Sequence, residues 1–461
     1  MKVFEYYDIR EFQFRFGKGT GLNIYDIVRY GPLSYGPLYG DSHTLSVERY
    51  KSILILHSED TKDDVLRLAK HLSKGHENKR IFPGFNDLFK LSIEVSTIPF
   101  KKYEPKEIYD TFTDHCRNID TCFPLIILPR TPRGEYDSVY YRTKAVFLRE
   151  EVPPQVFTSD LLKNEQNYRW SLLPTAIQIF TKMGGIPYTL DRGTLGEVVY
   201  EDVAVFIVGL SISYHPLYKH RGVGFLVVFD QAGTWCFMDS TAILLRSEKG
   251  TIGKRISELL RKAIRSILEI SKKRKNVLII HYSGKEVGRV EEEAIANAIR
   301  EAEELDKFLA VYILKIKESD IVINDTQSEH RTEGTKTGYP PIGLTLQLKP
   351  DLYLMFTSGY FTTSIDSIRA NIRKGLSRAR IISRHREIEP EKNELKLDNK
   401  ALLATVFGLS RLSYNSVQNP LMSEPLTTRY SREIAWISLR LSELGVNLDA
   451  KSRIKKVMWF I

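Results

Sequence analysis

The sequence contains very little cysteine. Its 461 residues include three, Cys116, Cys122 and Cys236. Three cysteines at this spacing are too few for a disulfide framework or a zinc site. Because disulfide-free chains suit a reducing compartment, we predict a cytoplasmic protein.

Long apolar runs are also missing. The longest, residues 203–212, is about half of the ~20 residues that a membrane-spanning helix needs. The first residues, MKVFEYYDIREFQF, include no apolar stretch suited to a signal peptide. We therefore predict no direct membrane insertion, so that any action at a membrane requires a partner that recruits the chain. The sequence also has no internal repeat at the periods of solenoids or propellers.

What the sequence does have is a moderate excess of basic residues. Lys and Arg number 67 against 57 Asp and Glu, which gives a formal charge of +10. With 42% hydrophobic and 27% charged residues, the chain is typical of a globular protein, and its length suggests roughly two to four domains. The basic excess favours an acidic partner, nucleic acid before an anionic membrane.

Two successive α/β patterns follow a short N-terminal segment. The turn-rich stretch SYGPLYGDSH (34–43) ends that segment, and alternating strand-like and helix-like runs then predict a small parallel α/β domain. A second unit starts near residue 165. Its three meandering strands and later crossovers predict a mixed sheet of the ribonuclease H-like kind. The expected strands cover 52–58, 122–130, 202–214, 276–284 and 307–317, and hairpins are expected across 223–239 and 344–358. The expected helices cover 61–75, 135–150, 170–185, 252–268, 291–306, 400–412 and 429–443.

Several segments, taken together in their order and spacing, resemble the Argonaute family. They are YGPLYG, FPGF (82–85), the helix with Gln178, Lys182 and Gly184-Gly185, HYSGKE (281–286), LSRLSYNSVQNPLMSEPLTTRYSREIA (409–435) and the terminal KKVMWFI. The similarity is to short prokaryotic, archaeal-type members, which lack the PAZ domain. It implies a Rossmann-like MID domain over 41–163, packed on a ribonuclease H-like PIWI domain over 164–461. It also implies that residues 1–40 pack on PIWI.

The resemblance implies a pocket between MID and PIWI for the 5′-phosphate of a guide strand. The family motif is Tyr-x-x-x-Lys on a helix, a Gln in the next strand and a Lys on the first PIWI helix. The matching positions, with one further polar ligand, are Tyr140, Lys144, Gln155, Lys182 and Gln178. The carboxylate of Ile461 matches the group that joins Mg²⁺ to the phosphate in microbial members.

The residue types suit a phosphate without reference to a family. Tyr140 and Lys144 lie four residues apart and share one helix face. The tyrosine ring can stack on a base, and lysines form charge-assisted hydrogen bonds with phosphate. A carboxylate beside a phosphate requires a cation between them, and Mg²⁺ accepts such oxygen ligands. The alternative for each residue is ordinary packing or solvated charge, because this helical spacing is common.

The resemblance places two of the four metal-binding carboxylates of an active PIWI domain at Ser211 and Ser283. A hydroxyl brings no charge with which to hold two cations together. The last ligand would fall near residues 430–432, which contain no Asp or His. We therefore predict a catalytically inactive protein. Asp239 ends a neighbouring strand and could be mistaken for a tetrad member, but no pairing of strand-borne acids fills two tetrad positions.

Basic residues elsewhere are weaker candidates for contact with a nucleic-acid backbone. They are Arg130, Arg133, Arg373, Lys374, Arg378 and Arg380. The alternatives for the later group are a solvated insertion or a docking site for a partner protein.

The resemblance implies a guide RNA or DNA and a complementary target. It also implies a heteromeric partner that covers the 3′ half of the guide and supplies an effector, in defence against viruses or plasmids. Two other functions stay open: a guided endonuclease with an unorthodox metal site, and an interaction scaffold whose pocket has decayed.

Overall fold

The structure is a computed structural model of the chain. It describes residues 2–8, 11–17, 19–21, 31–38, 47–130, 138–191, 193–195, 203–214, 221–240, 249–271, 275–283, 289–300, 308–319, 321, 331–332, 335–336, 340, 342–357, 379–388, 397–414, 424–446 and 452–461. Within these ranges, no helix is both long enough and apolar enough to cross a membrane.

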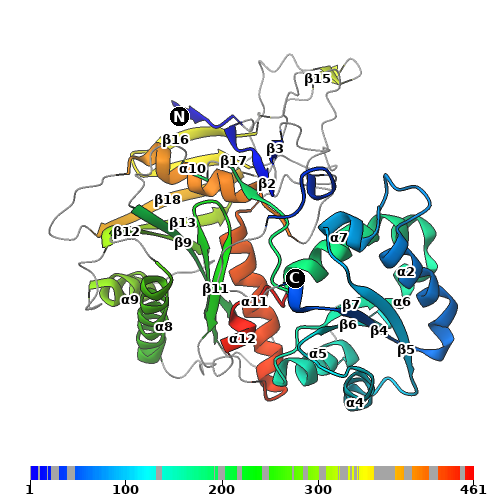
Figure 1. The fold of residues 1–461 in the computed structure, drawn as a ribbon. Helices are drawn as coiled ribbons and strands as arrows, with labels where there is room; N and C mark the ends of the chain where they lie inside the picture. Colours follow the sequence, from blue (N-terminus) through cyan, green and yellow to red (C-terminus); the bar gives the residue numbers. More distant parts are fainter. Residues whose placement is uncertain are drawn as a thin grey trace.

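A four-stranded parallel sheet forms the first α/β unit (Figure 1). Its order is β5 (Glu94–Phe100), β4 (Ser52–Ser58), β6 (Cys122–Leu128) and β7 (Gln155–Thr158). All three pairings are parallel. The two inner strands, β4 and β6, are buried almost throughout, which explains why their sequences are continuous apolar runs. The predicted parallel α/β unit is confirmed.

Helices cover both faces of this sheet. The chain forms η2 (Val47–Arg49), η3 (Glu59–Thr61), α2 (Lys62–Lys74), α3 (Phe85–Phe89), α4 (Pro105–His115), α5 (Val139–Arg149), α6 (Ser159–Lys163) and α7 (Glu165–Lys182). Apolar side chains of α2 and α7 share a core with Ile53 and Ile55 of β4. Those of α4 and α5 pack with Leu54 and Leu56, on the opposite face.

Helix α7 begins earlier than the sequence predicts. The expected helix covered residues 170–185, whereas α7 starts at Glu165. The side-chain oxygen of Asn164 accepts a hydrogen bond from Asn167 N at 3.0 Å and caps the first turn. The helix ends before Gly184, whose φ of 94° suits a residue without a side chain. Its last residue is Lys182.

A nine-stranded mixed sheet forms the second α/β unit. Its order is β1 (Lys2–Tyr6), β16 (Leu344–Lys349), β17 (Leu352–Phe356), β18 (Ala379–Ile388), β13 (Phe308–Glu318), β12 (Lys275–Ser283), β9 (Val203–Tyr214), β10 (Arg221–Asp230) and β11 (Trp235–Ser240). Strands β9, β10 and β11 form an antiparallel meander, and β12 and β13 continue from β9 in parallel. The predicted mixed sheet is confirmed.

Strand β18 was not expected as a strand, because its sequence ARIISRHREI is rich in charge. It pairs with β13 on one side and with β17 on the other. Backbone hydrogen bonds to two neighbours satisfy its N–H and C=O groups, and side-chain charge gives no sign of such pairing.

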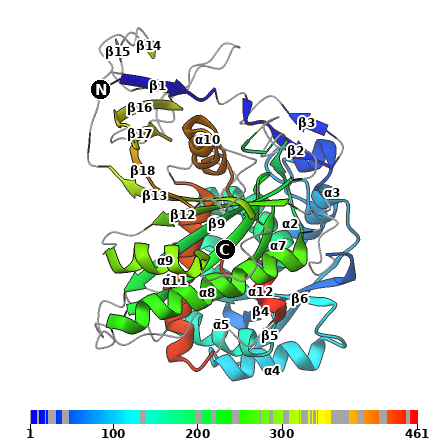
Figure 2. The same ribbon diagram turned by 90° about the vertical axis from the view of Figure 1, so that its left-hand side faces the viewer.

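The two faces of the mixed sheet carry different helices (Figure 2). Helices α8 (Lys249–Ile270) and α9 (Arg289–Arg300) lie together on one face and share a core with β9, β10 and β12. Helices α10 (Asn399–Ser410) and α11 (Leu426–Glu443) belong to the core of the other face, and α12 (Ser452–Lys455) contacts β11. The remaining strands are β2 (Phe14–Phe16), β3 (Gly19–Gly21), β8 (Thr189–Leu190), β14 (Arg331–Thr332) and β15 (Thr335–Lys336).

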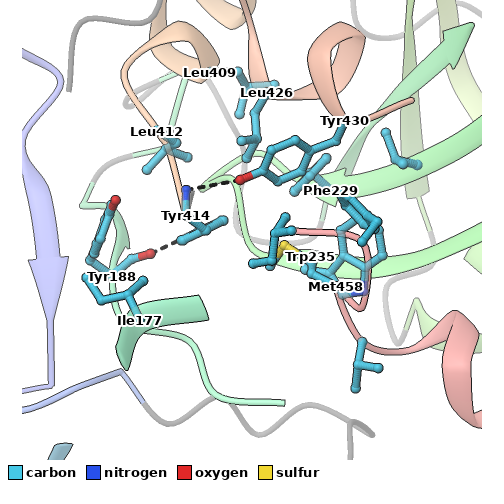
Figure 3. Close-up of a cluster of buried hydrophobic side chains, with 14 of the residues drawn as sticks. Ile177, Tyr188, Phe229, Trp235, Leu409, Leu412, Tyr414, Leu426, Tyr430 and Met458 are labelled. Carbon is cyan, nitrogen blue, oxygen red and sulfur yellow. Dashed lines mark hydrogen bonds between the residues drawn. The ribbon is translucent and has the colours of Figure 1, made fainter. Parts of the chain in front are cut away.

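One apolar core joins the two units (Figure 3). It contains Ile177 of α7 together with Phe229 of β10 and Met458 near the chain end. Tyr414 N donates a hydrogen bond to Tyr430 Oη at 3.0 Å, and Tyr414 Oη donates to Tyr188 O at 3.0 Å. Because α7 belongs to this shared core, the end of α7 has a fixed position relative to both sheets. The divisions after residues 40 and 163 stay predictions.

Candidate functional site

Two buried lysines meet where α5, β7 and α7 come together. Lys144 lies in the middle of α5, and Lys182 is the last residue of α7. Their relative exposures are 2% and 1%. Lysine is almost never fully buried unless it is paired. The positions therefore call for a chemical explanation.

Two more predicted residues, Tyr140 and Gln155, contact this pair. Lys144 Nζ lies 4.9 Å from the ring centroid of Tyr140, one helical turn earlier. Lys182 Nζ donates hydrogen bonds to Gln155 Oε1 at 2.6 Å and to Pro154 O at 3.2 Å. The structure thus brings together Tyr140, Lys144, Gln155 and Lys182.

Both N–H donors of the Gln155 amide form hydrogen bonds inside the protein. Its Nε2 donates to Gln178 Oε1 at 3.0 Å and to Val156 O at 3.1 Å, while its Oε1 accepts from Lys182. An amide nitrogen has two N–H donors, so none remains for a ligand. Gln155 therefore positions Lys182. Gln178 joins the cluster as the residue that orients the Gln155 amide.

The site holds two basic groups and, within the described residues, no carboxylate that acts on Lys182. Burial, and then the nearby Lys144 ammonium, hold the pKa of Lys182 well below its ordinary value. Within the ranges that the structure describes, neither lysine forms an ion pair with a carboxylate. A buried charge without a partner costs several kcal/mol, so an anion from outside the chain would be bound strongly here.

Two buried hydroxyls belong to the N-cap and the first turns of α5, the helix that carries Lys144. Ser138 Oγ and Thr143 Oγ1 are buried and have no hydrogen-bond partner among the described residues. Ser138 occupies the N-cap position of α5, yet its side chain does not cap the helix. A serine before a helix normally indicates a cap, so the sequence gave no sign of a spare hydroxyl.

The chain end packs into the shared core. The ring centroid of Phe460 lies 5.7 Å from that of Trp235 and 5.1 Å from that of Tyr430. Ile461 is 8% exposed, and both ribbon views place it beside α7 (Figures 1 and 2). Its carboxylate is not among the charges that act on Lys182. The apolar tail is thus a core element.

The carboxylate of Ile461 is an oxygen ligand of the kind that magnesium takes. Mg²⁺ keeps most of its waters and takes one or two carboxylates plus a phosphate, so the Ile461 carboxylate suffices on the protein side. The two lysines repel a cation, and an anion must therefore lie between them and any metal.

The weaker basic candidates are only partly placed. Arg130 is exposed, two residues beyond the end of β6. The backbone of Arg380 lies in β18 opposite Glu318. Arg133, Arg373, Lys374 and Arg378 lie outside the described residues.

Ser211 and Ser283 are direct neighbours across β9 and β12. Alternate residues of a strand point to opposite faces. Both serines therefore share the face of Ile207 and Ile279, whose core includes α10 and α11. Ser211 is buried, and Ser283 Oγ has no hydrogen-bond partner within the described residues. Two hydroxyls stand side by side on this face.

The nearby acid Asp239 lies on the other face of the mixed sheet from Ser211 and Ser283. It lies opposite Leu226, which packs in the core under α8 and α9. Strand alternation therefore places Asp239 on the face away from Ser211. Its Oδ1 lies 2.7 Å from Lys455 Nζ. Residues 430–432, where the last metal ligand is expected, lie in α11. There, Ser431 Oγ donates a hydrogen bond to Thr428 O at 3.1 Å.

Side chains that bind metals do not gather within the described ranges. No group of three or more His, Cys, Asp and Glu residues there could hold an ion. Glu286 and Asp366, two further acids near the expected tetrad in the sequence, lie outside those ranges.

His281 forms hydrogen bonds that link two helices to β12, the strand that carries Ser283. Its Nδ1 and Nε2 lie 2.9 Å from Thr427 Oγ1 of α11 and Thr405 Oγ1 of α10. Burial lowers the pKa of His281 to about 3. In the unfolded chain His281 is therefore protonated below about pH 6.5, whereas in the folded protein it is protonated only below about pH 3.

We expect stability to fall by a few kcal/mol as the pH drops from about 6.5 through about 3, because only the unfolded state gains the His281 proton in that window. Thermal unfolding of the wild type and His281→Gln, measured across this range, tests the link. The variant should be less stable at neutral pH and should lose less stability on acidification. Parallel pH profiles for the two proteins would contradict the assignment.

Comparison with known proteins supports the fold. No family model and no curated protein matches the chain. The crystal structure of A. aeolicus Argonaute is 16% identical with a TM-score of 0.55, and the alignment covers 95% of this chain and 54% of that one. For Aa-Ago with externally bound siRNA, the identity is 16%, the TM-score 0.55 and the coverage 100% and 56%.

Clostridium butyricum Argonaute, bound to a guide DNA and a 19-mer target DNA, gives a TM-score of 0.62 at 15% identity. That alignment covers 95% of this chain and 53% of the other. At such identity the likeness establishes the α/β fold, with its parallel sheet and its mixed sheet. The chain spans about half the length of the solved Argonautes that it matches.

Proposed function

We propose that this protein binds the 5′-phosphorylated end of a guide strand and recognises a complementary target without cleaving it. The observation that carries the proposal is the pair Lys144 and Lys182, both buried beside each other without a carboxylate among the described residues. A terminal phosphate supplies the two negative charges that this pair lacks.

Each residue of the cluster has a distinct part in this binding. The Lys144 and Lys182 ammonium groups donate charge-assisted hydrogen bonds to phosphate oxygens. The Tyr140 ring offers its face to the first base, a contact of about 1–3 kcal/mol that any base can make. Gln155 and Gln178 keep Lys182 in place. The site accepts an RNA or a DNA strand because none of these contacts reads the sugar.

The direct test compares two single strands of one sequence, one with a 5′-phosphate and one with a 5′-hydroxyl. Fluorescence anisotropy at fixed salt should give a much lower Kd for the phosphorylated strand. Salt must be matched because backbone contacts depend steeply on it. Equal affinities would refute the proposal and favour a scaffold whose pocket has decayed.

The proposed lack of cleavage rests on Ser211 and Ser283, which lie side by side on β9 and β12, at the positions where the resemblance implies carboxylates. Asp239 lies on the other face and is paired with Lys455. A guide-loaded protein incubated with labelled target and Mn²⁺ should leave the target intact. Cleavage that disappears in Glu286→Gln or Asp366→Asn would establish a guided endonuclease with an unorthodox metal site instead.

We further propose that Mg²⁺ joins the guide phosphate to the carboxylate of Ile461. The ion supplies positive charge between two anionic groups, which otherwise repel each other. Chelation of Mg²⁺ should weaken binding of the 5′-phosphorylated strand by about tenfold, or roughly 1.4 kcal/mol, and leave the 5′-hydroxyl strand unchanged. One glycine appended after Ile461 moves the carboxylate away and should remove the Mg²⁺ dependence. A dependence that survives the extension would reject this ligand.

The resemblance to short Argonautes motivates a proposal about partners. We propose a heteromeric partner that covers the 3′ half of the guide and couples recognition to an effector in defence against viruses or plasmids. The site of action is the cytoplasm, or a membrane to which the partner recruits the chain. The 3′ half of a bound guide should be digested by a nuclease in the isolated protein and protected in the complex isolated from cells.

A further inference from the structure

The hydrogen bonds of Lys182 match an uncharged amine better than an ammonium group. Its Nζ donates to two acceptors, Gln155 Oε1 at 2.6 Å and Pro154 O at 3.2 Å. An ammonium group has three N–H donors, whereas an amine has two and a lone pair. Within the described residues, no acceptor takes a third N–H of this buried side chain. The two hydrogen bonds in the free protein therefore use both N–H donors of an uncharged Lys182 amine.

The charges around Lys182 favour the same form. Helix α5 presents Lys144 and Tyr140, and among the described residues Lys144 provides the one charge that acts on Lys182. Strand β7 and the residue before it present only amide and carbonyl groups. The end of the chain lies beside α7 in both ribbon views, and the Ile461 carboxylate is not among the charges that act on Lys182. Burial and Lys144 together lower the pKa of Lys182, and neither is offset by an acid.

We propose that the site selects a dianionic terminal phosphate and gains one proton, on the Lys182 amine, when that phosphate binds. The inference rests on the proposed function. Solvent supplies the proton, –NH₂ becomes –NH₃⁺, and no other bond forms or breaks. The new N–H donates to a phosphate oxygen. The ammonium groups of Lys144 and Lys182 then balance the two negative charges of the phosphate.

Charge matching explains how the end of a strand is distinguished from its interior. A 5′-phosphate is a monoester with a second pKa of about 6, so it is dianionic at neutral pH. An internal phosphodiester carries a single negative charge and would leave one buried ammonium uncompensated. The affinity for a 5′-phosphorylated strand therefore passes through a maximum with pH. It falls below about pH 6 because the phosphate gains a proton, and it falls at alkaline pH because protonation of Lys182 becomes costly.

Isothermal titration calorimetry measures the proton directly. The 5′-phosphorylated strand is titrated into the protein between about pH 7 and about pH 9, in two buffers that differ in ionisation enthalpy. We expect uptake that rises towards one proton per strand as the pH increases. The same strand with a 5′-hydroxyl, or with a 5′-methyl phosphate diester, should bind more weakly and without proton uptake.

Three variants separate the possible outcomes. Lys182→Arg carries a permanent charge and should bind the phosphate without proton uptake. Lys182→Met should lose the phosphate preference, whereas Lys163→Met, at an exposed position in α6, should behave like the wild type. Tight, phosphate-dependent binding by the wild type without uptake at any pH in this range would overturn the proton inference and leave the proposed function intact. Absence of any phosphate preference would reject both.

The ε-carbon resonance of Lys182 gives a second readout in case the variants fold poorly. It is assigned in lysine-labelled protein as the signal missing from Lys182→Met. In the free protein the pKa read from this signal should lie well below those of the other lysines. Addition of the 5′-phosphorylated strand should raise that pKa. A signal that stays that of an ammonium group up to about pH 9 would contradict the proposal.

Discussion

Replacement of Lys144 and Lys182 together by methionine should abolish the preference for a 5′-phosphorylated strand. A hydrogen bond to a charged group contributes about 1.5–3 kcal/mol, so two of them correspond to roughly 10²–10⁴ in Kd. Methionine retains most of the buried apolar stem and removes the Lys144 ammonium and the Lys182 amine from the protein interior. We therefore expect no large loss in thermal stability, because the desolvated Lys144 charge is removed while Gln155 and Pro154 each lose one donor.

The control for this variant is the same binding assay with a 5′-hydroxyl strand. Its Kd should change little, because that strand has no phosphate at the pocket. Circular dichroism and the thermal midpoint establish that the variant is folded. If a folded double variant still prefers the phosphate, the two lysines are not the anion ligands, and the proposed site is misplaced.

The change Gly209→Ala should produce a large loss of stability. A Cβ at this position would lie 2.2 Å from Thr427 O and 2.5 Å from Thr427 C. These are backbone atoms at the start of α11, so they cannot rotate away as a side chain would. Helix α11 must shift from β9 or β9 must bend. Overpacking of this kind costs about 3 kcal/mol or more.

Differential scanning fluorimetry should show a fall in the midpoint of roughly 5–10 °C for Gly209→Ala. The matched control is Ser211→Ala, two residues along the same face of β9, which removes one oxygen and adds no atom. It should change the midpoint by a much smaller amount. If the two variants unfold at the same temperature, the close approach of β9 and α11 is not a tight contact.

The fold was largely readable from local pattern. The continuous apolar runs of β4 and β6 indicate strands buried on both faces, and the spacing of apolar residues in α8 indicates an amphipathic helix. These signals depend on neighbours within a few residues. Strand β18 and the early start of α7 were missed, because one depends on pairing with distant strands and the other on a single capping side chain.

The candidate site was predictable in its residue types but not in its chemistry. Tyr140 and Lys144 share a helix face by their spacing alone. Nothing in the sequence shows that Lys144 and Lys182 are both buried, or that they lack a carboxylate among the described residues. The sequence predicts Gln155 as a ligand, whereas its three hydrogen bonds to Val156, Gln178 and Lys182 are visible only in the structure.

The sequence by itself determined the two α/β units, their sheet types and the serines at positions 211 and 283, because each is a property of local composition and order. Tertiary structure decided which side chains meet. The shared core around Tyr414 and Tyr430 fixes α7 against both sheets and so brings Lys182 to Lys144. Burial then sets the charge state of Lys182. Desolvation depends on all the atoms that surround the side chain, and the residues next to it in the sequence do not determine it by themselves.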